Sequence, residues 1–293
     1  MIKDKTLYDL QNLVRKLVSD KNSIDDVRSF LLQLIFCFYC EESGIFLGKP
    51  FTQLVLNSEA SSFPSRFMQL IASLPPFMAK PQQLFLSDDT HHAMKKLCRI
   101  SWNDVNPSIM GAVHQAALSR SDQRATGTHY TSLRNVHDKL LIDKLIDQFS
   151  ETKSAEEIAV LYEQLGKISV FDPACGGGNF LIESYLGLSA MRLIASRGIS
   201  SVKPLSTRNF HGLELSEEAA CICRTALFAT ARLEEKRYAE QFKTPLSPVD
   251  LSECGDIRCI DALNFDWDKI SADYIVGNPP FMFNHKEQSF SQT

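Results

Sequence analysis

The sequence of 293 residues lacks the features that mark membrane, secreted or zinc-dependent proteins. No stretch approaches the roughly 20 unbroken apolar residues of a membrane span, and the first residues have no apolar signal-peptide core. The eight cysteines occur singly or at spacings such as Cys37/Cys40 and Cys221/Cys223, without a second pair at zinc-finger distance. We therefore expect a cytoplasmic protein with reduced thiols, no bound metal and no membrane partner.

An excess of positive charge is also lacking. Lys and Arg number 31 against 35 Asp and Glu, which gives a formal net charge of -4. Nucleic-acid binding relies on clustered Lys and Arg, although a basic groove can lie on an acidic protein. If DNA is the substrate, much of the surface that grips it should lie elsewhere.

What is present is the composition of a globular protein, 44% hydrophobic and 23% charged. Residues 1 to about 120 have helical periodicity, as in "LYDLQNLVRKLVSD", where leucines and a valine recur at three-and-four spacing. Ser23 is a plausible N-cap for the long apolar helix that follows it. We predict a helical N-terminal domain over residues 1–120.

From about residue 165, short apolar runs each end in a turn and lead into a helical pattern. The runs are "ISVFDPACGGG", "NFHGLELS", "DIRCIDAL" and "ADYIVGNPP". Apolar runs without alternation indicate strands buried on both faces, and strand-helix alternation predicts a parallel α/β sheet. Ligands bind such sheets at the carboxyl ends of the strands, where all four turns would lie. We assign residues 121–293 to this second domain.

The first turn follows Asp172 and contains Gly176, Gly177 and Gly178, which let a ligand approach the backbone at a helix N-terminus. A dinucleotide fingerprint would need a third glycine where Leu181 stands, so NAD and FAD are disfavoured. A P-loop would need Gly-Lys-Ser/Thr where Asn179-Phe180 stands. The ligand is therefore of another class.

Two acidic residues follow the next strands. Glu214 is placed to accept hydrogen bonds from both ribose hydroxyls of a nucleoside, although it could equally be a solvated residue that caps the next helix. Asp261 ends the third predicted strand and could accept a hydrogen bond from an adenine amino group, with Asp256 as a nearby competitor.

The fourth turn carries "NPPF", Asn278 to Phe281. The two prolines make a rigid backbone poor in donors, whose carbonyls must find partners elsewhere. An amino group held between the Asn278 side-chain carbonyl and the Pro279 backbone carbonyl would have its lone pair aimed at an electrophile, and Phe281 offers a face on which a base can stack. The alternative is a Pro-Pro turn with an incidental aromatic residue.

Upstream, "GTHYTS" lies in a polar turn before a helix. Thr131 and the neighbouring amides could hold a small carboxylate at the helix N-terminus, or could be loop residues with no special role.

The ordered motifs resemble those of amino-methylating DNA methyltransferases of the gamma arrangement. "GTHYTS", "DPACGGGNFL", "GLEL", "DAL" and "NPPF" look like the family's leading motif, cofactor loop, ribose acid, adenine-contacting position and catalytic tetrapeptide. "FLLQLIFCFYCEESGIF" and "MGAVHQAALS" are similar to the helical segment of MmeI-like restriction-modification enzymes. The resemblance covers nearly the whole chain.

The resemblance implies a Rossmann-like domain that depends on S-adenosylmethionine and methylates the N6 amino group of a flipped-out adenine in DNA. The implied cofactor-binding residues are Thr131, Asp172, Pro173, Ala174, Gly176, Gly178, Phe180, Glu214 and Asp261. The implied catalytic residues are Asn278, Pro279, Pro280 and Phe281. The reaction needs positioning of an activated methyl group more than a strong base.

The departures from the family pattern define the alternatives. Related loops often carry Ser or Cys where Gly177 stands, a change we expect to be tolerated. Residues 1–120 contain no convincing nuclease cluster, so DNA cleavage is not predicted. The parallel sheet is expected to be incomplete, which favours a fragment or one half of a split enzyme whose second polypeptide supplies the remaining strands and base recognition. A non-catalytic cofactor-binding or interaction module remains an alternative, and a protein-glutamine or RNA methyltransferase is a further one.

Overall fold

The computed structural model describes residues 2–72, 84–116, 154–196, 199 and 202–279. The first part of the chain is helical, as predicted. Its helices are α1 (Ile2–Ser19), α2 (Ile24–Glu42), α3 (Pro50–Asn57), α4 (Phe63–Ile71), α5 (Asp88–Leu97) and α6 (Ile109–Ala116), with a 3-10 turn at Trp102–Asp104. We call residues 2–116 the helical region.

Helix α2 is the centre of the helical region. Its N-cap is Ser23, whose side chain accepts a hydrogen bond from the Asp26 backbone N–H at 3.1 Å, which confirms the predicted cap. Cys37 and Cys40 are fully buried, as expected for thiols on an apolar helix. Because α2 is buried along nearly its whole length, it contacts neighbours on several sides, including α1, α3 and α6.

Aromatic side chains fill the space around α2. Phe38 stacks on Trp102 with ring centroids 4.7 Å apart, and the Trp102 indole N–H donates to the Leu97 carbonyl at 3.1 Å. Phe30 meets Phe67 edge to face at 5.3 Å. Buried aromatic pairs of this kind add about 0.5–1.5 kcal/mol each beyond the area they bury. The helical region therefore owes its stability to apolar packing.

The second part of the chain is an α/β domain with parallel strands, also as predicted. The strands are β1 (Val170–Asp172), β2 (Phe210–Glu214), β3 (Asp256–Cys259) and β4 (Tyr274–Ile275), in the order β3-β2-β1-β4. The helices are α10 (Ala155–Leu165), α11 (Asn179–Ala195) and α12 (Glu217–Phe242), with 3-10 turns at Thr207–Asn209, Ala262–Asn264 and Trp267–Lys269. We call residues 154–279 the α/β region.

The two faces of the sheet are covered differently. Helices α11 and α12 pack on one face, and α10 packs on α11. The other face carries Phe171 and Leu213, which are covered by Phe265 from the segment that follows β3. Central strand β1 is buried throughout, whereas Ile275 on β4 is 67% exposed. Burial on both faces was predicted for all four strands, but only β1 is buried throughout. Strand β2 is mostly buried, and the outer strands β3 and β4 are largely half-buried or exposed.

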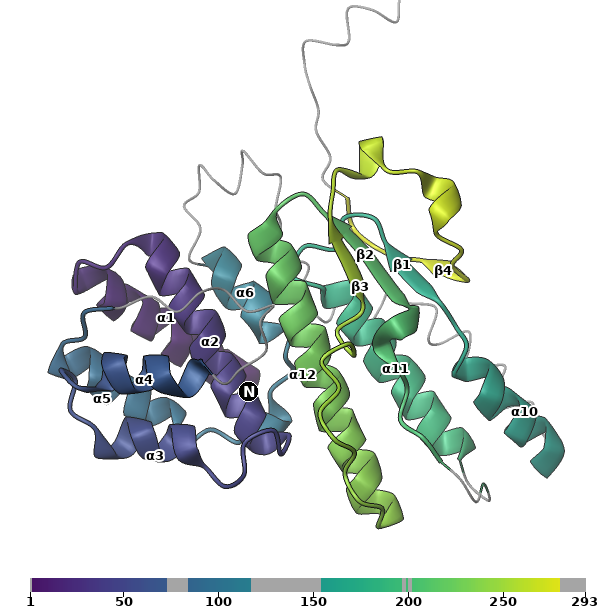
Figure 1. Cartoon of the computed structure of the whole chain (residues 1–293), viewed down its shortest axis with the longest axis horizontal. Coiled ribbons are helices and arrows are strands. Elements are labelled where there is room, and N and C mark those ends of the chain that lie inside the picture. The colour runs from purple at the N-terminus through teal and green to yellow at the C-terminus, as the bar shows by residue number, and fades with distance from the viewer. Residues whose placement is uncertain (1, 73–83, 117–153, 197–198, 200–201, 280–293) are drawn as a thin grey trace, which may run out of the picture.

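The helical and α/β regions share one hydrophobic core. Figure 1 shows α12 between the helical region on the left and the sheet on the right. Phe36 of α2 lies 6.1 Å from Phe228 of α12, ring centre to ring centre, and both rings are fully buried. Across the same junction the Lys236 side chain donates to the Glu42 carbonyl at 2.6 Å, and the Asn106 side chain donates to Glu183 at 2.7 Å. The boundary expected at residue 120 lies outside the described residues.

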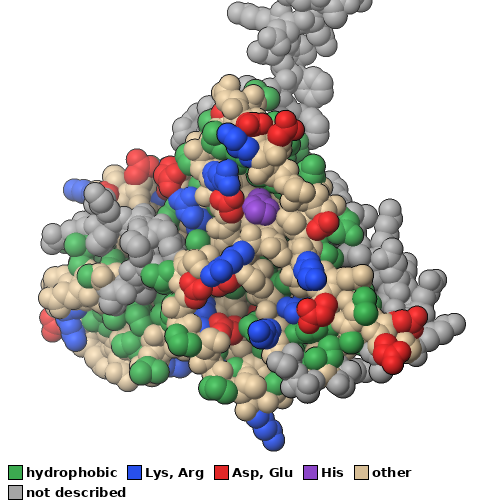
Figure 2. Space-filling view, turned by 45° about the vertical axis from the view of Figure 1, so that its right-hand side comes forward, with side chains coloured by type: hydrophobic (Ala, Val, Ile, Leu, Met, Phe, Trp, Pro, Cys, Tyr) green, Lys and Arg blue, Asp and Glu red, His purple; other side chains and the backbone are tan. Residues whose placement is uncertain are grey.

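Charged side chains of both signs are mixed on the surface that Figure 2 shows. Lys and Arg side chains are interspersed there with Asp and Glu and form no continuous basic stripe on that face. Among the described residues, no helix is long and apolar enough to cross a membrane.

Candidate active site

The parallel sheet brings the predicted turns to one edge. Strand β1 lies between β2 and β4, with Asp172 opposite Gly212 and Phe171 opposite Ile275. Because all the strands run in the same direction, the glycine turn, Glu214, Asp261 and Asn278 all follow carboxyl ends of strands. This edge is the candidate active site.

Asp172 lies at the centre of this edge. Its side chain is 1% exposed, and its Oδ1 accepts a hydrogen bond from the Ala174 N–H at 3.0 Å. Its Oδ2 is buried without a hydrogen-bond partner among the described residues. Burial raises the pKa of Asp172 to about 7. A buried carboxylate oxygen without a donor is costly, which indicates that a donor from a ligand belongs there.

Gly277 connects Asp172 with the NPPF segment. It has φ +145°, and a Cβ atom built on it would lie 2.6 Å from Asp172 Oδ1. Only glycine allows this approach, so the backbone after β4 passes directly over the Asp172 carboxyl group. The sequence analysis did not single out Gly277, although a glycine directly before Asn-Pro-Pro is a visible signal of close backbone packing.

Glu214 connects β2 with the glycine turn. Its Oε2 accepts a hydrogen bond from the Gly176 N–H at 2.9 Å, and its Oε1 accepts one from the Ser216 N–H at 2.9 Å. Helix α12 is capped instead by the Ser216 hydroxyl, which accepts from the Ala219 N–H at 3.3 Å. Each carboxylate oxygen has two lone-pair directions, so both oxygens keep capacity for a ligand hydroxyl.

Asp261 and Asp256 lie at opposite ends of β3. Asp256 begins the strand, and its carboxylate is paired with Arg258, which holds the pKa of Asp256 below its usual range. The strand ends at Cys259, two residues earlier than predicted, and Asp261 follows it as the cap of a 3-10 turn. Its carboxylate accepts from the Leu263 N–H at 3.0 Å. Of the two candidates, Asp261 is the one that lies at the carboxyl ends of the strands.

The remaining predicted residues divide into described and undescribed ones. Asn278 and Pro279 follow β4 and are exposed, while Pro173 and Ala174 lie half-buried beside Asp172. Phe180 is 8% exposed in the first turn of α11. Thr131, Pro280 and Phe281 lie outside the described residues.

A cysteine lies within the glycine turn. Cys175 is buried, and its N–H donates to the Leu213 carbonyl at 2.9 Å. Contact with the Cys223 thiol, together with burial, raises the pKa of the Cys175 thiol well above its usual range. A neutral buried thiol is a poor nucleophile, so the turn is not built for covalent cysteine catalysis.

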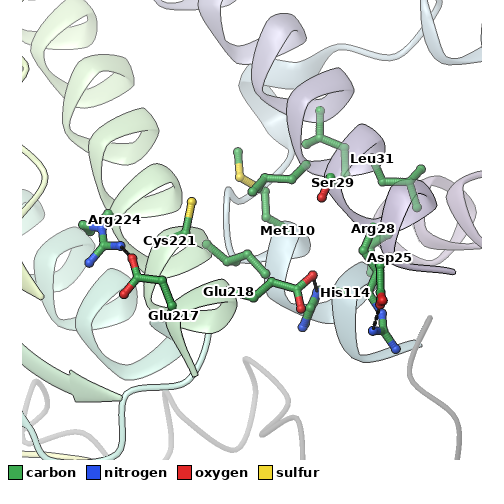
Figure 3. A pocket seen from close by; sticks show the side chains of 14 residues that line it. Asp25, Arg28, Ser29, Leu31, Met110, His114, Glu217, Glu218, Cys221 and Arg224 are labelled. Atoms are coloured by element: carbon green, nitrogen blue, oxygen red, sulfur yellow. Dashed lines mark hydrogen bonds and ion pairs between the residues drawn. The ribbon is translucent and has the colours of Figure 1, made fainter. Parts of the chain in front are cut away.

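A cavity of about 480 Å³ lies between α2, α6 and the first two turns of α12. Figure 3 shows Asp25 and Arg28 on the α2 side, with the side chains of His114 and Glu218 next to each other. His114 Nδ1 lies 3.4 Å from Glu218 Oε1, yet burial lowers the pKa of His114 to about 4. The cavity lies behind the glycine turn, since its lining residue Ile222 comes within 3.5 Å of a Cβ built on Gly177.

The described residues contain no group of three or more side chains suited to a metal ion.

A helical region joined to a parallel α/β domain, with a glycine turn after the first strand and Asn-Pro after the fourth, is the arrangement of a methyltransferase domain behind a helical segment. Two family models match the chain. Residues 148–293 match the DNA-methyltransferase domain of MmeI, and residues 25–100 match the MmeI helicase spacer domain. The chain therefore carries an MmeI-like DNA-methyltransferase domain that follows an MmeI-like helicase spacer.

Individual relatives agree with this assignment. DNA methyltransferase A of Bacillus subtilis (strain 168) is 26% identical over an alignment of 323 residues. The alignment covers 96% of this chain and 36% of that protein. The structure of the type IIL restriction-modification enzyme MmeI in complex with DNA has the same fold, with a TM-score of 0.76 and 22% identity over 94% of this chain and 43% of that one. The chain thus spans well under half the length of these two relatives.

Proposed function

We propose that this chain provides the cofactor site and the amino-methylating residues of a DNA methyltransferase that transfers a methyl group from S-adenosylmethionine to the N6 amino group of adenine. The observation that carries the proposal is the convergence, at one edge of the sheet, of the Asp172 turn and Asn278 on neighbouring strands. Methyl transfer requires a cofactor and an acceptor held side by side, and this edge offers a place for each.

The residues at the edge fit the cofactor. The orphaned Asp172 Oδ2 is suited to an ammonium group, and the backbone at Gly176 is open, since a Cβ atom built there would meet nothing within 4 Å. Glu214 would accept from ribose hydroxyls, and Asp261 would accept from an adenine amino group. Pro173, Ala174, Gly178 and Phe180 would shape the turn around the ligand, and Thr131 would hold its carboxylate. The bound cofactor supplies a methyl group already activated on a sulfonium.

The chain's own contribution to the transfer is to orient the acceptor. The Asn278 side-chain carbonyl and the Pro279 backbone carbonyl would each accept one N–H of the target amino group, which aims the nitrogen lone pair along a fixed direction. Pro280 would keep the turn rigid, and Phe281 would stack on the base. A base within a duplex cannot reach such a site, so the target adenine must be flipped out.

We further propose that additional polypeptide covers β4. Within the described part of the chain β4 pairs with β1 alone, and Ile275 is 67% exposed. Unpaired strand edges with apolar side chains are liabilities that proteins cover. The cover is either a further part of a longer protein or a second chain, and it would also supply base recognition. The cytoplasm, where DNA is accessible, is the proposed location.

The test is methyl transfer from labelled S-adenosylmethionine to unmethylated DNA, by the chain alone and with the polypeptide encoded by the neighbouring reading frame. The methylated nucleosides are identified after digestion. N6-methyladenine is expected, whereas methylcytosine would contradict the base assignment. Parallel reactions with RNA and with a glutamine-containing protein test the two other acceptors. Binding of S-adenosylhomocysteine without transfer to any acceptor would identify a non-catalytic cofactor-binding module instead.

A further inference from the structure

The three consecutive glycines of the cofactor turn have three different surroundings. Gly176, with φ +52°, faces open space, and Gly178, with φ +88°, would place a Cβ atom 2.7 Å from Cys223 Sγ. Gly177 does not have a positive φ that would favour glycine. A Cβ atom on Gly177 would instead lie 2.9 Å from the Cα atom of Gly111, closer than real Cβ atoms approach a backbone. Gly177 is therefore glycine because helix α6 of the helical region lies against it.

The contact is reciprocal. A Cβ atom on Gly111 would lie 3.4 Å from Gly177 Cα and 3.7 Å from the Gly177 carbonyl oxygen. Gly111 lies inside α6, where glycine destabilises a helix by about 0.5–1 kcal/mol relative to alanine. Close backbone packing accounts for glycine at Gly177, whereas a Cβ atom on Gly111 would lie at van der Waals distance from the turn. It also gives a structural reason for Gly177, at a position where related loops often carry Ser or Cys.

Helix α6 is held firmly enough to act as a support. Met110 and Val113 are almost fully buried, and α6 packs on α1, α2 and α12. Just before α6, the Asn106 side chain accepts from the Ser108 N–H at 3.0 Å and donates to Glu183 of α11 at 2.7 Å. The turn thus lies between two fixed helices, with Gly177 against α6 and Gly178 against α12.

We propose that Gly111 and Gly177 are positioning residues through which the helical region sets the place of the cofactor turn. The contact holds the turn at the distance at which the Gly176 N–H reaches Glu214 Oε2, 2.9 Å away. Displacement of the turn would separate Gly176 from the carboxylate proposed to bind the ribose. The inference rests on the proposed cofactor site and assigns the helical region a part in cofactor binding.

The test uses the full chain and titration calorimetry with S-adenosylhomocysteine. Gly177→Ala is expected to weaken binding by about tenfold or more, because its Cβ must push either the turn or α6. Gly111→Ala is expected to weaken binding less, by about two- to fivefold, since its Cβ contacts are longer and alanine favours the helix. In the transfer assay, KM for the cofactor should rise more than kcat falls.

Val113→Ala is the matched control. It removes buried side-chain volume from α6 without adding an atom at the turn, so it should lower the melting temperature while leaving the dissociation constant within about twofold. Hydrogen exchange of the amides of residues 176–180, measured without ligand, provides a second readout. Exchange should be faster in Gly177→Ala than in Val113→Ala.

The outcomes are separable. Folded Gly177→Ala and Gly111→Ala proteins with wild-type affinity and wild-type loop exchange would overturn the positioning role. If Gly177→Ala does not fold, Gly111→Ala decides alone. If the wild-type chain does not bind S-adenosylhomocysteine but Gly177→Ala still accelerates loop exchange, the cofactor proposal fails while the support of the turn by α6 stands.

Discussion

The helical region and the α/β region differ in what their interiors contain. Around α2, aromatic and aliphatic side chains fill most of the interior, with a few buried polar residues such as Gln33 and Glu41 among them. At the sheet edge, the buried Asp172 carboxyl group has one oxygen without a partner in the described part of the chain, and Gly277 approaches it closely. The first region gains stability from packing, whereas the buried carboxyl group costs the second region stability, as is common where a protein keeps a functional site. Because the two share a core, the stable region can support the strained one.

Asn278→Ala separates chemistry from binding at the sheet edge and should have the largest effect. Loss of the side-chain carbonyl removes one of the two acceptors for the target amino group, so turnover should fall by about a thousandfold or more. Affinity for S-adenosylhomocysteine should stay within about threefold, because Asn278 lies outside the proposed cofactor contacts. Transfer of labelled methyl groups and calorimetry check the two halves, and loss of both together would refute this division of labour.

Phe228→Ala breaks the core that joins the two regions. Phe228 is fully buried on α12 and faces Phe36 of α2. Truncating a buried phenylalanine destabilises a protein by about 3–5 kcal/mol. Denaturant unfolding monitored by circular dichroism should keep a single transition at a lower midpoint. Two separate transitions would show that the regions unfold independently, and Leu56→Ala, at a residue 47% exposed, provides the control.

Asp172→Asn tests how much stability the buried carboxyl group costs the folded protein. The folded pKa of about 7 lies above the ordinary value of 3.8, so the folded state binds more protons between them and wild-type stability should rise as pH falls from 8 toward 4. The variant should be more stable than wild type at pH 8, by a few kcal/mol at most, and should lack this pH dependence.

The same substitution should weaken S-adenosylhomocysteine binding by about tenfold or more at pH 8, because the ammonium group loses its carboxylate. Wild-type affinity should fall as pH drops below about 7, where Asp172 becomes protonated. Thermal melts and calorimetry at pH 6 and pH 8 measure both effects. Unchanged affinity would remove Asp172 from the cofactor site.

His114→Gln tests a buried histidine at the junction of the two regions and should have the smallest effect. The pKa of His114 is lowered to about 4 by burial, assisted by Arg28 and opposed by Asp25. A lowered folded pKa contributes stability above pH 6.5 that is lost as pH falls toward 4. Wild type should therefore lose about 1–2 kcal/mol more than the variant between pH 7 and pH 5. The free energy of unfolding is measured with urea at the two pH values. Equal losses for wild type and variant would exclude burial of a neutral His114.

Much of the architecture could be predicted from local patterns. The Ser23 cap, the helical texture of the first region and the central parallel strands follow from residues that lie close together in sequence. The end of β3 at Cys259 and the exposure of Ile275 could not be predicted, because they depend on which neighbours each strand finds in the sheet. The roles assigned to Glu214, Asp261 and Asn278 remain predictions, although the fold brings them to a common edge.

By itself, the sequence determined the residue types of the turns and their order along the chain, because turn chemistry and strand periodicity are local properties. The methyltransferase class came from the resemblance of these ordered motifs to a known family. Only the tertiary structure decided why each glycine is needed. Gly177 faces Gly111 of the helical region and Gly277 faces the Asp172 carboxyl group. These partners are distant in sequence, so a glycine can signal a close backbone approach without showing which residue it approaches. The same applies to the shared core, since Phe36 and Phe228 look alike in sequence whether they face each other or separate interiors.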